Sequence, residues 1–191
     1  YFLRRRIGLF GGSFDPFHLG HFLIARLAKE KFRLDEVVYL PCARSPLKSS
    51  QPIAPSLERL QWLKTGLAGE KWARVSSWEI MRPGLSYSVD TALCWRLKHP
   101  GAQLFWIMGS DQWKVLHQWK DHKKLSRIVH FLVFPRPNPP RPRTAVKMSV
   151  LPERFDISST QIRQRLKQKL SIRGMVPPEI EKRIQVSRFY R

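Results

Sequence analysis

The stretch Gly11-Gly12-Ser13-Phe14-Asp15-Pro16-Phe17-His18-Leu19-Gly20-His21 constrains the fold more than any other part of the chain. It follows the apolar run 7–10 and precedes a segment with helical periodicity over residues 19–31. A strand, a glycine turn and the start of a helix, in this order, are typical of α/β proteins that bind phosphate at the helix N-terminus. We therefore predict a phosphate site at residues 11–21.

Small and basic side chains within this stretch favour the same interpretation. Adjacent Gly11 and Gly12 let a ligand approach main-chain N–H groups closely. Gly20 falls in the first helical turn, where glycine costs roughly 1 kcal/mol relative to alanine, so we expect a nucleotide to lie against it. His18 and His21 are three residues apart and can present two imidazoles to one group. The glycine spacing matches neither GxGxxG nor a Walker A loop.

Composition sets the class of protein and of partner. A chain of 191 residues with 42% hydrophobic content can bury one core, so we predict a single domain over residues 1–191. The net charge of +21 implies polyanionic partners such as nucleoside triphosphates or RNA. Because the basic residues are dispersed along the chain, nucleic acid is not expected as the main partner.

Two further features of the composition concern the cellular compartment. Cys42 and Cys94 have no metal-ligand spacing and are interpreted as reduced, buried thiols. No apolar run approaches the ~20 residues that a membrane helix needs. We expect a cytoplasmic protein with no membrane partner. A homo-oligomer is compatible with the sequence.

Strand-like and helix-like segments alternate along the chain. The expected strands are residues 7–10, 37–40, 72–78, 104–108, 128–134 and 146–150. The expected helices are 19–31, a segment from Ser56 as N-cap to Leu67, 86–97, and one that starts at 158. In the helix over 86–97, the side chains expected to face the core are those of Val89, Ala92, Leu93 and Leu97. This order predicts an α/β fold with a doubly wound, mostly parallel sheet and a short C-terminal helical portion over about 158–191.

Two other segments complete the expected site. Gly109-Ser110-Asp111 follows an apolar strand, and in a parallel sheet its turn lies at the same edge as the first glycine turn. Ser158 and Gln161 have the spacing of a capping box, which predicts a helix start with hydroxyls and N–H groups at its tip. Arg163 can add a guanidinium to any phosphate bound there.

The two phosphate segments together resemble the nucleotidylyltransferase superfamily. Its signatures are Gly-x-Phe-Asp-Pro followed by His-x-Gly-His, matched at residues 12–21, and Ile-Ser-Ser-Thr-x-Ile-Arg, matched at residues 157–163. The resemblance implies a Rossmann-like fold that binds ATP. In this superfamily the second signature is associated with the ATP triphosphate.

Four further segments of the chain resemble the corresponding segments of bacterial nicotinate-nucleotide adenylyltransferases. They are Pro46-Leu47-Lys48, residues 86–93, Gly109-Ser110-Asp111 with Trp119, and the tail over 176–191. The chain departs from that family's pattern at Leu47 (usually histidine), Ser88 (usually threonine), Lys120 (an aromatic residue in some relatives) and Asn138 (commonly glycine).

This resemblance implies transfer of AMP from ATP to nicotinate mononucleotide, with release of deamido-NAD and pyrophosphate. It implies catalytic roles for His18, His21, Lys48 and Arg163. It implies an ATP site of Gly11, Gly12, Ser13, Phe14, His18, Gly20, His21, Gly109, Asp111, Ser159, Thr160 and Arg163. It implies a mononucleotide site of Asp15, Lys48, Ser88 and Trp119. Mg²⁺ is expected to be bound mainly through the ATP phosphates, with no dedicated protein ligand for the metal.

Roles within the site follow from the charge of the reactants. His21 is expected to reach the α-phosphate, and neighbouring phosphates should favour charged imidazoles at His18 and His21. Asp111 is expected on the adenosine ribose or, alternatively, as a helix cap. Two other functions stay open: an adenylyltransferase of the same fold acting on phosphopantetheine or another small phosphate, and a basic nucleic-acid-binding module on this scaffold.

Overall fold

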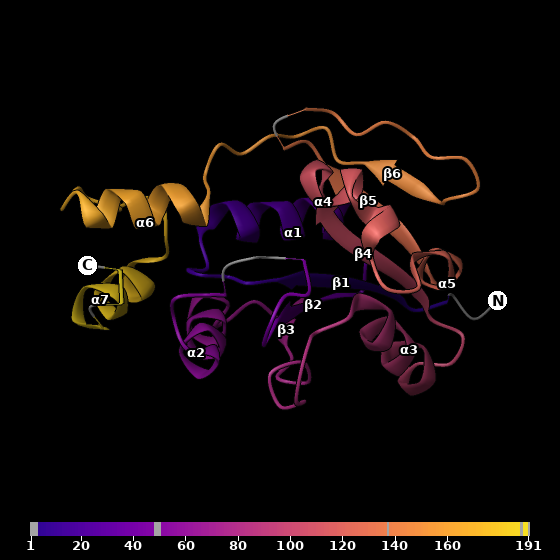
Figure 1. Ribbon diagram of the computed structural model, residues 1–191, viewed down its shortest axis with the longest axis horizontal. Helices are drawn as coiled ribbons and strands as arrows, with labels where there is room; N and C mark the ends of the chain where they lie inside the picture. Colours follow the sequence, from indigo (N-terminus) through magenta and orange to yellow (C-terminus); the bar gives the residue numbers. More distant parts are fainter. Residues whose placement is uncertain (1–3, 48–50, 137, 188, 191) are drawn as a thin grey trace.

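A sheet of six strands forms the centre of the protein, in the order β3-β2-β1-β4-β5-β6 (Figure 1). The computed structural model describes residues 4–47, 51–136, 138–187 and 189–190. The strands are β1 (Arg6–Gly12), β2 (Glu36–Pro41), β3 (Ala73–Val75), β4 (Gln103–Gly109), β5 (Val129–Phe134) and β6 (Met148–Val150). Every pairing among these strands is parallel, which confirms the predicted sheet.

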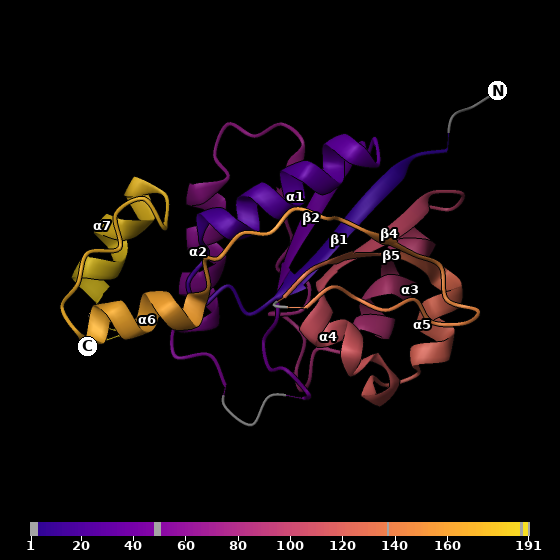
Figure 2. The same ribbon diagram turned by 90° about the horizontal axis from the view of Figure 1, so that it is seen from above.

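Helices cover both faces of the sheet. They are α1 (Leu19–Lys31), α2 (Ser56–Gly66), α3 (Ser88–Lys98), α4 (Ser110–Lys114), α5 (His122–Ile128), α6 (Ser159–Lys167) and α7 (Pro178–Ser187), with a 3₁₀ turn η1 (Leu116–Gln118) before α5. Seen from above, α1 and α2 lie on one side of the strands and α3, α4 and α5 on the other (Figure 2). This is the doubly wound α/β arrangement that the alternating pattern predicted.

The strands alternate their side chains between two apolar clusters, one on each face. In β4, Phe105 and Ile107 join the cluster under α1 and α2, while Leu104 and Trp106 join the cluster under α3 and α5. Strands buried on both faces are continuous hydrophobic runs, which is why 104–108 is recognisable in the sequence.

The strand order reverses between β1 and β4. Ile7 pairs with Glu36 of β2 on one side and with Leu104 of β4 on the other. From β1 the chain proceeds outward to β2 and β3, then returns to β4 on the opposite side of β1. In open α/β sheets ligands bind outside the carboxyl ends of the strands at such a switch point. Here those ends are Gly12 and Gly109.

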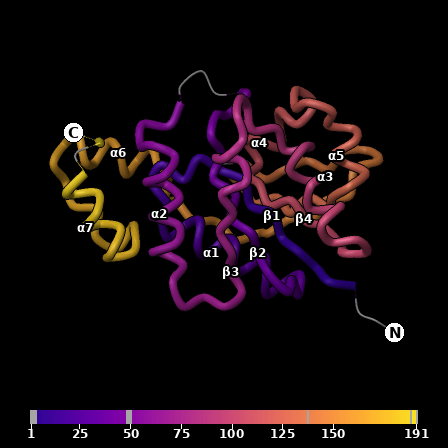
Figure 3. The backbone as a smooth tube through the Cα atoms, turned by 90° about the horizontal axis from the view of Figure 1, so that it is seen from below, coloured from indigo at the N-terminus to yellow at the C-terminus, as the bar shows by residue number. Residues whose placement is uncertain are grey.

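The C-terminal helices α6 and α7 lie beside α1 and α2, away from α3 and α5 (Figure 3). Ile162 of α6 and Ile180 of α7 are fully buried in the same apolar cluster as α1. This packing brings the start of α6 back to the first glycine turn.

Four local predictions were wrong. Cys94, which was expected to be buried like Cys42, is half-buried. The strand expected over 72–78 contains only Ala73–Val75, and the N-cap of α2 is Pro55, so Ser56 is the first helical residue. In α3, Leu97 is 80% exposed, whereas Trp95 is buried. Two residues turn a helix by about 200°, so Leu97 points away from the face that carries Trp95. Within the described residues no helix has the length and apolarity to cross a bilayer.

Candidate active site

A cavity of about 660 Å³ opens at the carboxyl ends of β1 and β4. Its walls come from the glycine turn after β1, the end of β4, and the N-terminal ends of α1, α3 and α6. The predicted site residues in its lining are Gly11, Gly12, Ser13, Phe14, Asp15, His21, Ser88, Gly109, Asp111, Trp119, Ser159, Thr160 and Arg163. His18 and Gly20 are buried next to His21, and Lys48 lies outside the described residues.

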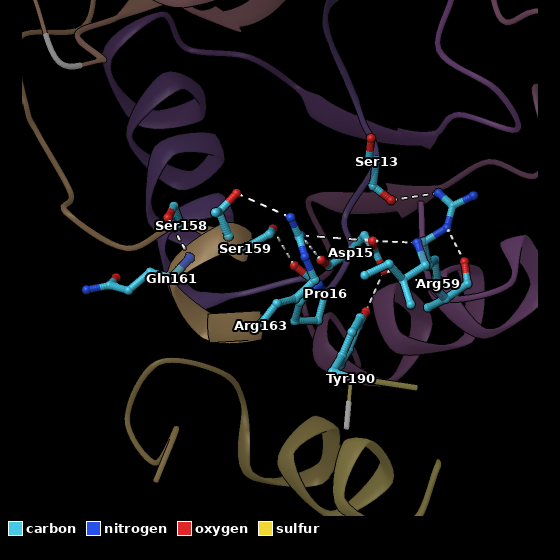
Figure 4. Close-up of polar contacts among 12 residues, drawn as sticks. Ser13, Asp15, Pro16, Arg59, Ser158, Ser159, Gln161, Arg163 and Tyr190 are labelled. Atoms are coloured by element: carbon cyan, nitrogen blue, oxygen red, sulfur yellow. Dashed lines mark hydrogen bonds and ion pairs between the residues drawn. The ribbon is translucent and has the colours of Figure 1, made fainter. Parts of the chain in front are cut away.

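The two predicted phosphate segments meet at this cavity. Ser159 Oγ donates a hydrogen bond to Pro16 O (2.9 Å), and Arg163 Nη1 donates one to Asp15 O (2.6 Å) (Figure 4). Ser158 caps α6, because its Oγ accepts a hydrogen bond from Gln161 N (3.1 Å). Segments about 145 residues apart in the sequence therefore share one wall.

His18 and His21 cap the N-terminus of α1 reciprocally. His18 Nδ1 accepts from His21 N and His21 Nδ1 accepts from His18 N, each at 3.3 Å. The two rings stack with centroids 3.6 Å apart and planes at 23°. Because both Nδ1 atoms accept, we assign the proton of each neutral ring to Nε2. Each imidazole can thus donate one hydrogen bond from Nε2.

The charge state expected for His18 was wrong. His18 is 1% exposed, and its burial, with a smaller contribution from the Arg136 charge, lowers its pKa to about 3. A second proton would also have to occupy Nδ1 and break the cap. Among the described residues, His18 Nε2 has no hydrogen-bond partner, although it is buried. His18 is therefore a neutral donor.

Gly20 makes room for this histidine pair. A Cβ at Gly20 would lie 3.0 Å from the His18 ring and 3.3 Å from Ile157 O. The space that we expected a nucleotide to use is filled by the protein's own imidazole and by the segment that leads into α6. Gly20 thus allows the start of α1 and the segment that leads into α6 to approach each other.

Asp15 joins four segments through one buried carboxylate. It accepts hydrogen bonds from Ile53 N (2.8 Å), Ala54 N (3.1 Å) and the Tyr190 hydroxyl, and lies 3.9 Å from Arg163 Nη1 (Figure 4). Its predicted contact with the mononucleotide stays a prediction. The structure shows that Asp15 positions the glycine turn, the loop before α2 and Arg163 relative to one another.

Arg59 is a residue of the site's framework that sequence reasoning missed. It lies on α2, is 1% exposed, and donates to Ser13 O (2.6 Å), Cys42 O (2.8 Å) and Ala54 O (3.1 Å). These carbonyls belong to the glycine turn, the end of β2 and the loop before α2. An arginine within an amphipathic helix gives no sequence signal that it faces inward.

The turn after β4 resolves the alternative for Asp111. The N-cap of α4 is Gly109, which makes no side-chain cap, and Asp111 is the second residue of the helix. Asp111 is therefore not the cap, and its exposed carboxylate lines the cavity. A Cβ at residue 109 would crowd Asp111 Oδ1, so a larger residue there would displace this carboxylate from its present position.

The far end of the cavity is formed by the start of α3 and by Trp119. Ser88 is the first residue of α3, whose N-cap Tyr87 makes no side-chain cap. Trp119 packs edge-on against Trp106, with centroids 6.2 Å apart and planes at 83°. Lys120 lies beside them, with its Nζ 4.4 Å from the centroid of the Tyr87 ring.

Two charged residues of the lining had no recognised signal in the sequence. Glu79 is buried, accepts a hydrogen bond from Thr91 Oγ1 (2.7 Å), and has its pKa raised mainly by that burial. Arg136 adds a guanidinium to the cavity wall. No group of three or more His, Cys, Asp or Glu side chains is placed to hold a metal ion in the described part of the chain.

Both the sequence and the fold are similar to those of known proteins. The model of the cytidylyltransferase-like family matches residues 9–165. A probable nicotinate-nucleotide adenylyltransferase from Methylacidiphilum infernorum is 38% identical over 97% of this chain and 92% of its own length. One from Thermus thermophilus is 41% identical, over 97% of this chain and its entire length.

Solved structures with a similar fold include the Plasmodium falciparum nicotinic acid mononucleotide adenylyltransferase complexed with NaAD. Its TM-score is 0.80 at 17% identity, with 98% of each chain covered. A putative nicotinate-nucleotide adenylyltransferase from Vibrio parahaemolyticus has a TM-score of 0.71 at 16% identity, covering 95% of this chain and 99% of its own. At these identities the likeness concerns the fold.

Proposed function

Because the chain belongs to the cytidylyltransferase-like family, and within it to the nicotinate-nucleotide adenylyltransferases, we propose that it transfers AMP from ATP to nicotinate mononucleotide. The products are deamido-NAD and pyrophosphate. The observation that carries this proposal is the meeting of the His18–His21 pair and the tip of α6 at one cavity.

The reaction needs alignment more than acid–base chemistry. A phosphate oxygen of the mononucleotide attacks the α-phosphorus of ATP, a new P–O bond forms, and the bond to pyrophosphate breaks. Because the nucleophile is already an anion, no general base is required. The protein must hold two polyanions in line and stabilise charge on the α-phosphate oxygens and the leaving group.

In our proposal, imidazole N–H groups stabilise the charge on the α-phosphate, and the glycine turn provides the backbone beside the nucleotide. His21 Nε2–H reaches the α-phosphate in the transition state, and His18 supports it as the stacked partner and second donor. A neutral imidazole N–H is a sufficient donor, since such preorganised groups stabilise developing charge without reorganising during the reaction. Gly11, Gly12, Ser13 and Phe14 supply the backbone against which the nucleotide lies.

Cations and hydroxyls at the tip of α6 hold the β- and γ-phosphates in this proposal. Arg163 is fixed by its hydrogen bond to Asp15 O and by a contact of Nη2 with Thr160 Oγ1 (3.3 Å), and it lies 25% exposed at the cavity. Ser159 and Thr160 supply hydroxyls beside it. Lys48, outside the described residues, is proposed to reach the phosphates of both substrates.

The remaining contacts orient the two nucleosides. Gly109 and Asp111 are proposed to contact the adenosine ribose, because the Asp111 carboxylate can accept hydrogen bonds from sugar hydroxyls. Trp119 is proposed to stack on the pyridine ring, with Ser88 near the ring's carboxylate. Mg²⁺ bound to the ATP phosphates would neutralise part of their charge. Phosphate oxygens and water are its proposed ligands.

One assay tests this function against the alternatives. The protein is incubated with ATP and Mg²⁺ and with nicotinate mononucleotide, phosphopantetheine or no acceptor, and pyrophosphate is measured. Release that depends on the pyridine nucleotide is expected. Pyrophosphate release with phosphopantetheine but not with nicotinate mononucleotide would favour the related adenylyltransferase. If neither acceptor led to pyrophosphate release, a binding module would be favoured.

A further inference from the structure

We propose that Lys120 makes the site selective for nicotinate over nicotinamide mononucleotide, by pairing its ammonium with the carboxylate on the pyridine ring. This inference rests on the proposed function and adds a specificity-determining residue to it. It concerns a position where the chain departs from the pattern of its family.

Lys120 lies at the end of the cavity away from the phosphate segments. It lines the cavity together with Trp119, Tyr87 and Ser88. Its ammonium is held over the face of the Tyr87 ring, with Nζ 4.4 Å from the centroid, a distance typical of a cation–π contact. A ring stacked on Trp119 would therefore have a positive charge near its edge.

The start of α3 adds to the positive potential at this place. The helix has 11 residues, and its N-cap Tyr87 leaves it without a side-chain cap. The unpaired N–H groups and the dipole of such an N-terminus favour an anion. Because Lys120 lies against Tyr87, the ammonium and the helix N-terminus act on the same ligand group.

Asp90 competes only weakly for the ammonium. Asp90 Oδ2 is 3.8 Å from Lys120 Nζ, which is longer than a hydrogen bond, and both side chains are partly exposed. Such pairs contribute little to stability. Glu79, a carboxyl group in the same lining, is engaged by the hydrogen bond from Thr91 Oγ1 (2.7 Å).

The two candidate substrates differ in the group that Lys120 would meet. Nicotinate presents a carboxylate, which gains a charge-assisted hydrogen bond from an ammonium, whereas nicotinamide presents a neutral carboxamide. A hydrogen bond to a charged group is stronger than one to a neutral group, and partial exposure of Lys120 weakens it. We expect Lys120 to account for about tenfold in selectivity, equivalent to about 1.4 kcal/mol.

The test is the ratio of kcat/KM for nicotinate and nicotinamide mononucleotide, measured by pyrophosphate release at saturating ATP and Mg²⁺. In Lys120→Gln, kcat/KM for nicotinate mononucleotide should fall about tenfold, while the value for nicotinamide mononucleotide changes less than about twofold. Lys120→Arg should keep the selectivity. Asp90→Asn should raise kcat/KM for nicotinate mononucleotide, because it removes the competing negative charge.

Lys123→Gln is the matched control, since Lys123 is an exposed lysine of α5 outside the cavity lining. It should leave the ratio unchanged. An equal loss of kcat/KM for both substrates in Lys120→Gln would show a structural role, and unchanged kcat/KM for both would show no role; either result overturns the inference while the function stands. Wild-type protein that is inactive with both mononucleotides would refute the proposed function and this inference with it.

Discussion

The stacked rings of His18 and His21 have a structural role and, in the proposed mechanism, a chemical role as well. Their Nδ1 atoms close the first turn of α1, and Nε2 is the donor in the proposed mechanism. Substitutions that preserve the cap and remove the imidazole can separate the two roles.

For His21, glutamine is such a substitution. Glutamine at the third position of a helix can reach back to the N-cap N–H, as in a capping box, so α1 should remain folded. We expect His21→Gln to lower kcat by about two orders of magnitude or more, the usual effect of losing a key transition-state donor. Pyrophosphate release measures kcat, and the thermal midpoint of unfolding reports the cap. A folded variant with undiminished turnover would contradict the role of His21.

For His18, the depressed pKa makes stability depend on pH. The native pKa is about 3 against 6.5 for the free side chain, so the unfolded state binds more protons between these values. The stability due to neutral His18 is therefore complete above pH 6.5 and is lost as the pH falls towards about 3. Between pH 7 and pH 5 the expected loss is about 2 kcal/mol.

Urea unfolding at both pH values, on wild type and on His18→Asn, measures that loss. Asparagine is a good N-cap and does not titrate, so the variant should show a smaller decrease in unfolding free energy between pH 7 and pH 5. Equal decreases in the two proteins would show that His18 does not titrate as described.

At the scale of elements, α2 holds the glycine turn after β1 in place through Arg59. This helix contributes little to the cavity wall itself, yet its buried guanidinium holds the carbonyls of Ser13, Cys42 and Ala54. The turn after β1, the end of β2 and the loop before α2 thereby keep one relative position. The buried charge is tolerated here because several carbonyl oxygens solvate it.

We expect Arg59→Met to lower the free energy of unfolding by about 3 kcal/mol, because three buried carbonyls lose their donor at about 1–3 kcal/mol each and the apolar side chain recovers part of this. Denaturant unfolding provides the measurement. Arg26→Met is the control, because Arg26 pairs with Glu30 on the exposed surface of α1 and such a pair contributes less than about 1 kcal/mol. Similar losses in both variants would refute the framework role.

At the scale of the whole molecule, the net charge of +21 has a kinetic consequence. Both proposed substrates are anions, and a positive field raises the rate at which they reach the cavity. Salt screens that field, with a Debye length of about 10 Å at 0.1 M.

We therefore expect kcat/KM for ATP to fall several-fold from low salt to about 0.2 M NaCl, while kcat at saturation changes little. Steady-state rates over a salt series, with sucrose as a viscosity control, measure this. A kcat that falls in parallel with kcat/KM would point to salt acting on the chemistry or the fold instead of on encounter.

Much of the fold was predictable because its signals are local. Residues 19–31 were expected to form a helix and do so with the same bounds, since apolar spacing and a glycine turn specify it. The continuous apolar run at 104–108 specified a central strand. The shortened β3 and the exposed Leu97 show where prediction from local signals fails. The length of an edge strand and the rotation of a helix about its axis depend on the segments packed against them.

The sequence by itself determined where the two predicted phosphate segments begin their helices, because the Gly-Gly-Ser turn, the histidine spacing and the Ser158 cap act through bonds among near neighbours. Only the tertiary structure decided how these residues behave. Burial makes His18 neutral, and the Tyr190 hydroxyl reaches Asp15 across 175 residues. Desolvation and long-range hydrogen bonds depend on what packs around a group, and that arrangement exists once distant segments have folded together.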